Sequence, residues 1–570
     1  MGAAQAQITP MPRGGDVIAH RVVAGDTLEQ LAARYLGDHR QWSLLQQHNG
    51  VANPYRLRPG SVLEIPSRLL RAAAASVEFV QGDVRASRPL DHLADTPATG
   101  VAPSPVRQGQ ALQEGDRLQL APDAFVAVRL ADGSLVRVQS QSDVLLRQMR
   151  RKGRAGSLQS VLDLREGSVE ATVAPDAQAG QRRFEIRTPA ASTSVRGTRF
   201  LVQTHGDADS GTGTVAAVDH GSVAVDSTLP AAQGGGTLLH PGQGLAVAAD
   251  GRIGQARDML DAPDTSAWPA LAEDANWVSL PLPTQAGAVR YQVMLARDAE
   301  LTQVLRNGSF TASPLRLSGV EDGDYVLSIR GVDAQGVPGR ASSHALRVKA
   351  HPVPPLYEAP AADAVVGLGR AGLQCTRVVG AARYRIQVAA AAPDADAFAH
   401  PVVDARDLQD CGLAAEALAS LPAGRYLWRA ASVRLLPDGQ ADQGPFAAPQ
   451  GLQLAVAPRQ PSADALQLDG GQGQGSRHIR WSGEAGQRYR VQAASGQDFA
   501  QPLVDVWVDR PEWSTEALPP GNYFMRLQIE DANGLRSEFS AARQFQTGSW
   551  ITDASGRMLH MGHGDRLQRQ

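Results

Sequence analysis

Lysine is almost absent from this sequence. Of the 55 Lys and Arg residues in its 570 positions, only Lys152 and Lys349 are lysines, and arginine supplies the rest. Together with the many alanines and glycines, this indicates a bias of genome composition rather than of function. The formal net charge is −3 and the pI is near 6.5, so nothing attracts the whole chain to nucleic acid or to an anionic membrane.

Long apolar runs are also missing. A helix that crosses a bilayer needs roughly 18 or more consecutive apolar residues, and even the stretch "LLRAAAASVEFV" is interrupted by Arg71 and Glu78. We therefore expect no transmembrane segment. Ala4-Gln5-Ala6 has the small-x-small spacing that ends secretory signals, but no basic or apolar stretch precedes it. Residues 1–19 are thus either the remnant of a lost signal peptide or an ordinary disordered N-terminus.

Enzyme signatures are a third absence. The chain has no G-x-S-x-G elbow, no H-E-x-x-H pair and no phosphate-binding glycine loop. His560 and His563 stand near the C-terminus without the carboxylate or thiolate support of a specific metal site. We expect no catalytic residue, no metal and no cofactor, and hence no enzymatic activity.

What is present indicates a multidomain, mainly β protein. At roughly 150 residues per domain the length predicts about four units. The patterns described below place the boundaries at residues 20–66, 76–256, 265–350, 353–457 and 461–547, followed by a C-terminal tail at 548–570.

The first unit, residues 20–66, has the pattern strand, helix, helix, strand. Asp26 or Thr27 can cap a helix in "LEQLAARYLG", and Gly37 ends it. A second helix in "RQWSLLQQHN" ends at Gly50, and "LRPGSVLEIP" returns as a strand. Such a small unit buries only a thin core.

These residues resemble a LysM domain, in the helix start "GDTL", the middle "NGVANP" and the end "LRPGSVLEIP". The resemblance implies binding to N-acetylglucosamine-containing glycan, which in bacteria means peptidoglycan, in a shallow groove between two loops. Leu28 and Pro54 would offer apolar contact to a sugar, or the same residues could be only helix caps and turn residues. The residues that the resemblance assigns to the groove are Gly25, Asp26, Thr27, Leu28, Asn49, Gly50, Val51, Asn53 and Pro54.

Residues 76–256 change to short alternating runs separated by glycine, which predicts an all-β domain. In "FVAVRLADGSLVRV" the valines of both arms share one face only if the turn has three residues, which we place at Asp132-Gly133-Ser134 as a bulged hairpin. The basic stretch "RQMRRKGRAG", residues 147–156, is expected to be a hairpin tip that is either solvated or in contact with anionic polymer or lipid.

The stretch "IRTPAASTSVRGTRFLVQ", residues 186–203, with "REGSVEATV" and "DHGSVAV", resembles a FecR domain. That family is known for regulators that pass a signal from an outer-membrane receptor to a sigma factor. Some are cleaved at a Gly-Thr bond, and the matching bond here joins Gly197 to Thr198. The alternative for this pair is a bend followed by re-entry into a strand. No sigma-binding helical region or membrane span precedes the domain in this sequence.

The last half repeats with a period of roughly 100 residues. One tyrosine marker recurs at Tyr291, Tyr384 and Tyr489, and a second recurs near the end of each repeat. Short alternating strands with Pro and Gly turns at this period indicate β-sandwiches in series. "LPPGNYFMRLQIEDANGLRSEFS" resembles the late strands of a fibronectin type III domain, so we expect three tandem immunoglobulin-like or fibronectin-like sandwiches.

Only two cysteines occur. Aligned on the third repeat, Cys375 takes the place of Trp481 and Cys411 the place of Trp513. We predict a Cys375–Cys411 disulfide across the second sandwich, which agrees with an oxidising compartment; two free thiols are the alternative.

Three functions remain open. The first is a non-catalytic scaffold of the periplasm or cell envelope that binds peptidoglycan and displays its β-domains to an unknown envelope protein, with no nucleic-acid partner. The second is a FecR-type sensor that acts in trans with a receptor. The third is an accessory to a wall-glycan hydrolase.

Overall fold

The computed structural model describes residues 17–88, 103–152, 158–173, 183–195, 198–207, 211–229, 235–370, 372–391, 397–469, 478–519 and 521–548. The protein is mainly β, as the sequence predicts, and its contacts divide it into two compact units at residues 349 and 350. Ala4-Gln5-Ala6, Arg154, Gly197, His560 and His563 lie outside the described residues.

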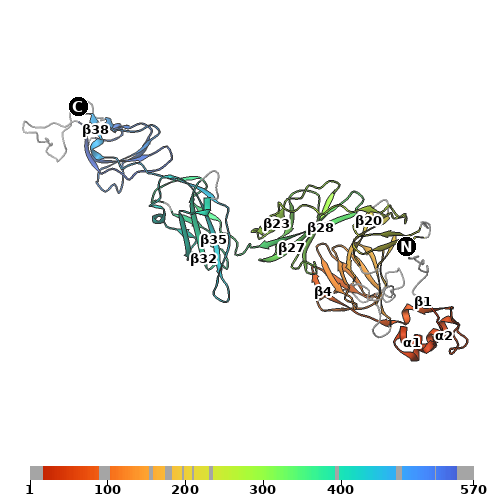
Figure 1. Ribbon diagram of the computed structural model, residues 1–570. Coiled ribbons are helices and arrows are strands. Elements are labelled where there is room, and N and C mark those ends of the chain that lie inside the picture. The colour runs from red at the N-terminus through yellow and green to blue at the C-terminus, as the bar shows by residue number, and fades with distance from the viewer. Residues whose placement is uncertain are drawn as a thin grey trace, which may run out of the picture. The chain divides into compact units, whose positions relative to one another are not determined.

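The N-terminal module, residues 17–70, has two helices beside a two-stranded antiparallel sheet (Figure 1). Its elements are β1 (Val17–Arg21), α1 (Leu28–Leu36), the 3-10 turn η1 (His39–Gln41), α2 (Trp42–Asn49) and β2 (Val62–Pro66). Of the two capping candidates, Thr27 is the cap: its Oγ1 accepts a hydrogen bond of 3.1 Å from the backbone N–H of Gln30. Gly37 and Gly50 end the helices in the left-handed conformation, where a Cβ would be strained.

The large β-domain, residues 75–258, consists of two sheets around one apolar core. In spatial order the first sheet contains β21 (Arg257–Asp258), β20 (Gln243–Val247), β17 (Gly211–His220), β16 (Arg199–Asp207), β13 (Ser168–Thr172), β10 (Leu135–Val138), β9 (Phe125–Arg129), β4 (Ala75–Gln81) and β7 (Ala111–Leu112). The second contains β19 (Thr237–Leu239), β18 (Val223–Ser227), β15 (Ala191–Val195), β14 (Arg183–Arg187), β12 (Leu158–Glu166), β11 (Asp143–Arg151), β8 (Arg117–Leu120), β5 (Val84–Ser87) and β6 (Ser104–Pro105), with β3 (Arg71–Ala72) beside β11.

The β9–β10 hairpin has a three-residue loop, as expected, but one residue earlier in the chain. Val128 pairs with Val136, and the backbone N–H of Leu130 bonds to the carbonyl of Ser134 at 2.9 Å, so the loop is residues 131–133. Gly133 takes the left-handed conformation at φ 86°, which fixes the bulge at the last loop position. The parity of the pairing, and therefore the face of every side chain, is the predicted one.

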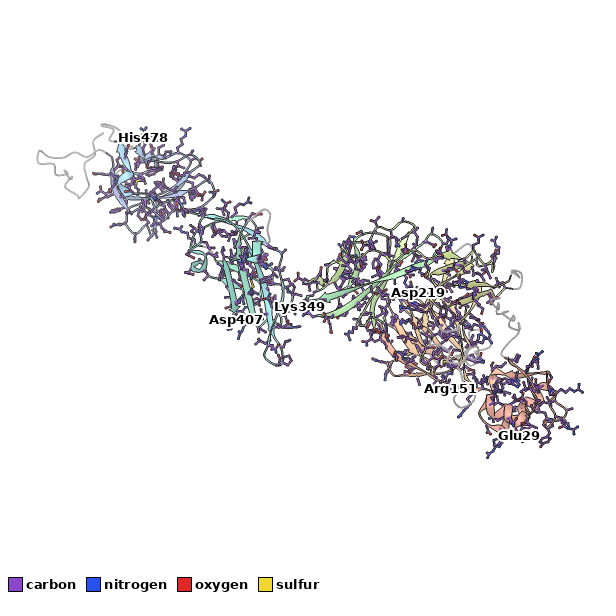
Figure 2. All side chains as sticks on the ribbon, viewed as in Figure 1. Glu29, Arg151, Asp219, Lys349, Asp407 and His478 are labelled. Carbon is purple, nitrogen blue, oxygen red and sulfur yellow. A yellow bond between two sulfur atoms is a disulfide. The ribbon has the colours of Figure 1, made fainter. Side chains whose placement is uncertain are left out.

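The basic stretch is not a solvated tip over its described length. Arg147 and Arg150 lie within β11, where Arg147 forms an ion pair with Asp163 and the Arg150 Nε donates to Glu114 at 2.6 Å. The strand continues to Arg151 because β3 pairs with it, opposite Arg71 (Arg151 is labelled in Figure 2). Arg147 and Arg150 are thus neutralised by carboxylates, and Arg150 also donates to the Leu70 carbonyl at the junction with the N-terminal module.

Three β-sandwiches follow. Sandwich 1 contains β22 (Leu271–Ala272), β28 (Pro338–Val348), β27 (Gly323–Val332), β24 (Arg290–Ala296) and β25 (Val304–Phe310) against β23 (Trp277–Leu280) and β26 (Leu315–Ser318). Sandwich 2 contains β29 (Tyr357–Ala359), β31 (Leu373–Cys375) and β34 (Gly412–Leu413) against β30 (Ala364–Gly367), β37 (Gln450–Ala455), β35 (Gly424–Leu435), β36 (Ala441–Phe446), β32 (Arg383–Ala390) and β33 (Val403–Leu408). Sandwich 3 contains β38 (Gln467–Asp469), β39 (His478–Arg480) and β42 (Glu512–Ser514) against β41 (Val504–Val508), β40 (Arg488–Ala494), β43 (Gly521–Glu530) and β44 (Arg543–Thr547).

The second tyrosine marker performs the same task in each sandwich. The hydroxyl groups of Tyr325, Tyr426 and Tyr523 each donate to the carbonyl four residues earlier, at 2.8, 2.8 and 3.0 Å. Such a tyrosine corner is typical of immunoglobulin-like sandwiches. The repeat in the sequence is therefore a repeat of a specific hydrogen bond.

The predicted disulfide is confirmed, with Cα atoms 5.1 Å apart, but it does not join the two sheets of sandwich 2. Cys375 ends β31 and Cys411 directly precedes β34, its neighbour in the same sheet. The backbone N–H of Cys375 bonds to the carbonyl of Cys411, and in sandwich 3 the same bond joins Trp481 to Pro511. The predicted match of Cys411 to Trp513 is thus wrong by two residues.

The large β-domain and sandwich 1 share a buried interface around one carboxylate. Glu170 in β13 is 1% exposed and lies 2.9 Å from Arg199, 3.7 Å from Arg137 and 3.2 Å from Arg330 of sandwich 1. Burial alone would raise the pKa of Glu170, but the attraction of the three guanidinium groups outweighs it and holds the pKa below its ordinary value. Beside it, an apolar cluster crosses the interface, with Phe125, Ala127 and Leu135 against Met294, Ala296, Leu301 and Val304.

Reduction of the disulfide should weaken sandwich 2 selectively. The bond closes a loop with a sequence separation of 36, and constraint of the unfolded chain over such a loop contributes roughly 3 to 4 kcal/mol. Hydrogen exchange with and without a reductant should show this loss of protection in β32 and β35. Sandwich 3, which has no cysteine, is the internal control. Equal protection of sandwich 2 in both states would contradict this expectation.

Replacing Glu170 by Gln should destabilise the interface by about 3–5 kcal/mol, because it leaves buried arginines without their counter-charge. Hydrogen exchange in β13 and β24 reports the loss. The control is Glu78→Gln, whose ion pair with Arg129 is more exposed and should be worth less than about 1 kcal/mol. Equal effects of the two variants would show that the buried network is not a special constraint.

Candidate functional site

The candidate groove of the N-terminal module is formed by two loops. The first, residues 22–27, connects β1 to α1, and the second, residues 50–61, connects α2 to β2. The loops adjoin because Val22 exchanges backbone hydrogen bonds with Gly60 and Ser61, each at 2.8 Å. Three glycines in these loops, Gly25, Gly50 and Gly60, have positive φ, and no other atom lies within 4 Å of where a Cβ would stand. The space beside the backbone at these positions, including Gly25 and Gly50 of the predicted groove, is therefore open to an approaching ligand.

Asp26 is committed to the fold of the first loop. Its Oδ2 lies 2.8 Å from the His20 Nε2 and accepts a hydrogen bond from the backbone N–H of Val23 at 2.8 Å. The other ring nitrogen of His20 is 2.9 Å from the hydroxyl of Tyr35. The hydrogen bond with His20 and that from Val23 hold the pKa of the Asp26 carboxyl below its ordinary value. This chain of side chains sets the shape of the loop that leads into α1.

Asn49 is similarly occupied. Its Nδ2 donates to the carbonyls of Leu45 at 2.9 Å and Glu64 at 2.6 Å, and its Oδ1 accepts from the Glu64 N–H at 2.7 Å. The two bonds with Glu64 tie the end of α2 to β2, and the bond to Leu45 lies within α2. The Asn49 side chain thus fixes where the second loop begins.

The side chain of Leu28 does not offer the apolar contact that we expected. It is fully buried in the module core, so only the backbone of Leu28 can face a ligand. Val51 packs against the same core, while Pro54 is half-buried and Asn53 is exposed. The Oδ1 of Asn53 accepts the Tyr55 N–H at 3.0 Å, which shapes the tip of the second loop.

Tyr55 is the residue that the sequence analysis missed. It is 76% exposed on the second loop, and Val23 on the first loop is 59% exposed. Exposed aromatic side chains provide a flat apolar face with a polar tip, which suits sugar rings. The available signal was its position, because it directly follows the Asn53-Pro54 pair that the LysM resemblance had already selected.

Of the two residues that form the predicted cleavage bond, the structure describes only Thr198. Thr198 is buried, and its backbone carbonyl accepts a hydrogen bond from Val173 at 2.8 Å. Its Oγ1 has no hydrogen-bond partner among the described residues, whereas Gly197 lies outside them. Within the described ranges no group of three His, Cys, Asp or Glu side chains is placed to hold a metal, and no helix is long and apolar enough to cross a bilayer.

Comparison with known families agrees with this architecture. The LysM domain family matches residues 20–66, and the family described as FecR protein matches residues 116–224. The chain therefore carries a LysM domain followed by a FecR domain, and the three β-sandwiches come after them. A comparison with curated proteins found no match.

Among solved structures, the chain is similar to two of a candidate anti-sigma factor from Parabacteroides distasonis ATCC 8503. The first is 21% identical over 25% of this chain and 59% of that chain, which is less than two thirds of its length, with a TM-score of 0.20. The second is 16% identical over 34% and 84%, also at 0.20. The FN1–FN3 domains of chicken CNTN1 are 13% identical over 48% of this chain and 95% of theirs, at a TM-score of 0.23.

Acid should weaken the LysM domain through Asp26. The pKa of Asp26 is lower in the folded than in the unfolded domain. The Asp26 carboxylate therefore stabilises the folded state above the unfolded pKa of about 3.9, and this stabilisation is lost as the pH falls through the folded pKa. Asp26→Asn should cost about 1–2 kcal/mol at pH 7, and the difference from the parent should shrink towards pH 3. Hydrogen exchange in α1 measures both. A difference that stays constant with pH would exclude Asp26 as the titrating group.

Proposed function

We propose that this protein is a non-catalytic scaffold of the cell envelope, tethered by its LysM domain to peptidoglycan or another N-acetylglucosamine-containing glycan. The observation that carries the proposal is the pair of adjoining loops with open backbone at Gly25 and Gly50 and an exposed aromatic ring at Tyr55. In this proposal the sugar acetamides bond to loop backbone, while the Tyr55 ring covers a sugar face.

The assigned residues divide into two roles within this proposal. Asp26, Thr27 and Asn49 shape the groove, since their side chains bond to its own backbone. Gly25, Leu28, Gly50 and Val51 present backbone, and Asn53, Pro54 and Tyr55 form the outer wall. A single shallow groove of this kind binds in the micromolar to millimolar range, about −8 to −4 kcal/mol. Firm attachment would need a second contact, from another copy or another domain.

The remaining domains support display rather than chemistry in this proposal. The FecR domain and sandwich 1 form one block through Glu170 and the apolar cluster, and two further sandwiches follow. Their partner would be another envelope protein or polymer, and the compartment would be the oxidising periplasm, in agreement with the disulfide.

A sensor function is the second candidate, favoured by the FecR match at residues 116–224. In that case the FecR domain would meet a receptor in trans, while the LysM domain holds it near the wall. Co-purification with a receptor domain, rather than with sacculi, would favour this function.

Tyr55→Ala should lower the affinity of the full chain for insoluble peptidoglycan about tenfold, equivalent to about 1.4 kcal/mol, because it removes the exposed ring and leaves the core intact. Co-sedimentation over a range of wall concentrations measures this. The matched control is Leu44→Ala, which removes an exposed apolar side chain from α2 outside the two loops. Sedimentation of the Tyr55 variant like the parent would remove Tyr55 from the site, and no sedimentation of the parent would refute the tether.

A further inference from the structure

A polar cleft of about 650 Å³ lies between the FecR domain and sandwich 1. One wall comes from the FecR domain and includes Gln139, Ser168 and Gln203, while the other comes from β24 and β25 and includes Gln292, Asn307 and Ser309. A volume of this size accommodates a small ligand rather than single waters. The cleft shares no residue with the LysM groove or with the disulfide of sandwich 2.

The two walls are held in place independently of any ligand. The ion pair between Glu170 and Arg330 and the apolar cluster around Met294 join the same two domains. The Gln292 Nε2 also donates to the Gln203 Oε1 at 3.1 Å across the cleft. Because the walls are fixed by buried contacts, a ligand would bind without the cost of ordering them.

Polar atoms in the walls lack partners. Ser168 is only 5% exposed, and its Oγ has no hydrogen-bond partner in the described part of the chain. The Oε1 of Gln292 is buried and equally unpartnered there. Buried polar groups are normally satisfied, since each unmade bond costs about 1–3 kcal/mol. Both residues line the cleft, so a polar ligand in it would lie beside them.

Two residues that line the cleft have a strained backbone. Asp123 and Gln141 line it, and both have positive φ, 61° and 55°, although neither is glycine. Residues held in this region cost free energy and gather at ligand sites more often than elsewhere. Here both residues add a polar side chain to the lining of the cleft.

The lining chemistry indicates the class of ligand. Five of the lining side chains are carboxamides, each of which carries a donor and an acceptor, namely Gln139, Gln141, Gln203, Gln292 and Asn307. Charges of both signs are present, on Arg165 and Arg290 and on Asp123 and Glu166. None of the residues that line the cleft is aromatic, so it lacks the flat apolar face that favours a sugar ring.

We propose that this cleft binds a short extended peptide with free termini, whose carboxylate pairs with Arg290 and whose backbone amides bond to the carboxamides of both walls. A guanidinium–carboxylate pair gives such a ligand its direction. This site is separate from the LysM groove, and it provides the FecR domain and sandwich 1 with a joint binding function that neither has alone.

Titration calorimetry of the full chain with tetraalanine tests the proposal, because this peptide offers only backbone and termini. Binding should be detected at about 1 mM peptide or below. Arg290→Gln should lower the affinity for tetraalanine at least tenfold. The parent chain should bind tetraalanine with an amidated C-terminus more weakly than the free peptide by the same factor. The matched control is Arg316→Gln, an exposed arginine of β26 outside the cleft, which should bind as the parent does.

Gln139→Ala, on the opposite wall, should also weaken binding severalfold, and it keeps the test valid should the Arg290 variant fail to fold. Tyr55→Ala should leave tetraalanine binding unchanged, which separates this site from the glycan tether. Absence of binding, or binding that neither cleft variant alters, would overturn the proposal. Loss of chitotetraose binding in Arg290→Gln would assign the cleft to a sugar and would equally overturn it.

Discussion

The buried carboxylate of Glu170 is the constraint on which the front half of the structure depends. A charge that is 1% exposed is tolerable only when it is paired, and here three arginines surround it from two domains. Arg199 also lies 3.7 Å from Asp219, which Figure 2 labels, so the network is partly balanced by a second carboxylate. Because Arg330 comes from sandwich 1, separation of this domain from the FecR domain would break the ion pair between Arg330 and Glu170 and leave Glu170 with fewer partners.

The three sandwiches show how one surface is adapted to different neighbours. On the outward face of each, a glutamine stands opposite an arginine, in the pairs Gln292–Arg330, Gln387–Arg429 and Gln492–Arg526. In sandwiches 2 and 3 the arginine bonds to its glutamine, at 2.9 and 2.7 Å, and stacks between two phenylalanines of its own domain. In sandwich 1 both partners turn to the FecR domain instead. The same pair thus bonds within its own domain in sandwiches 2 and 3, whereas in sandwich 1 it forms part of the interface with the FecR domain.

In the LysM domain, too, polar side chains are used mainly to hold the structure together. Asp26, Thr27 and Asn49 use their side-chain atoms to hold the loops, since so small a core leaves few other means of doing so. What remains for recognition is backbone at Gly25 and Gly50 and the ring of Tyr55. Together with the cleft beside Arg290, this places two proposed binding sites in the first unit of the chain, one for sugar and one for peptide.

The sequence by itself determined the local and periodic features. Alternation predicted the strands, Gly37 and Gly50 predicted the helix ends, and the tyrosine markers predicted the sandwiches, because these depend on side-chain period and on backbone conformation at single residues. The parity of the β9–β10 hairpin was correct for the same reason, although the position of Gly133 shifted its loop. Only the tertiary structure decided the pairing of Cys411 within one sheet, the burial of Leu28, and the meeting of Glu170 with Arg330. Those outcomes depend on strand register and on which faces pack together. Glu170 and Arg330 are 160 positions apart, and no local sequence pattern predicts a contact over such a separation.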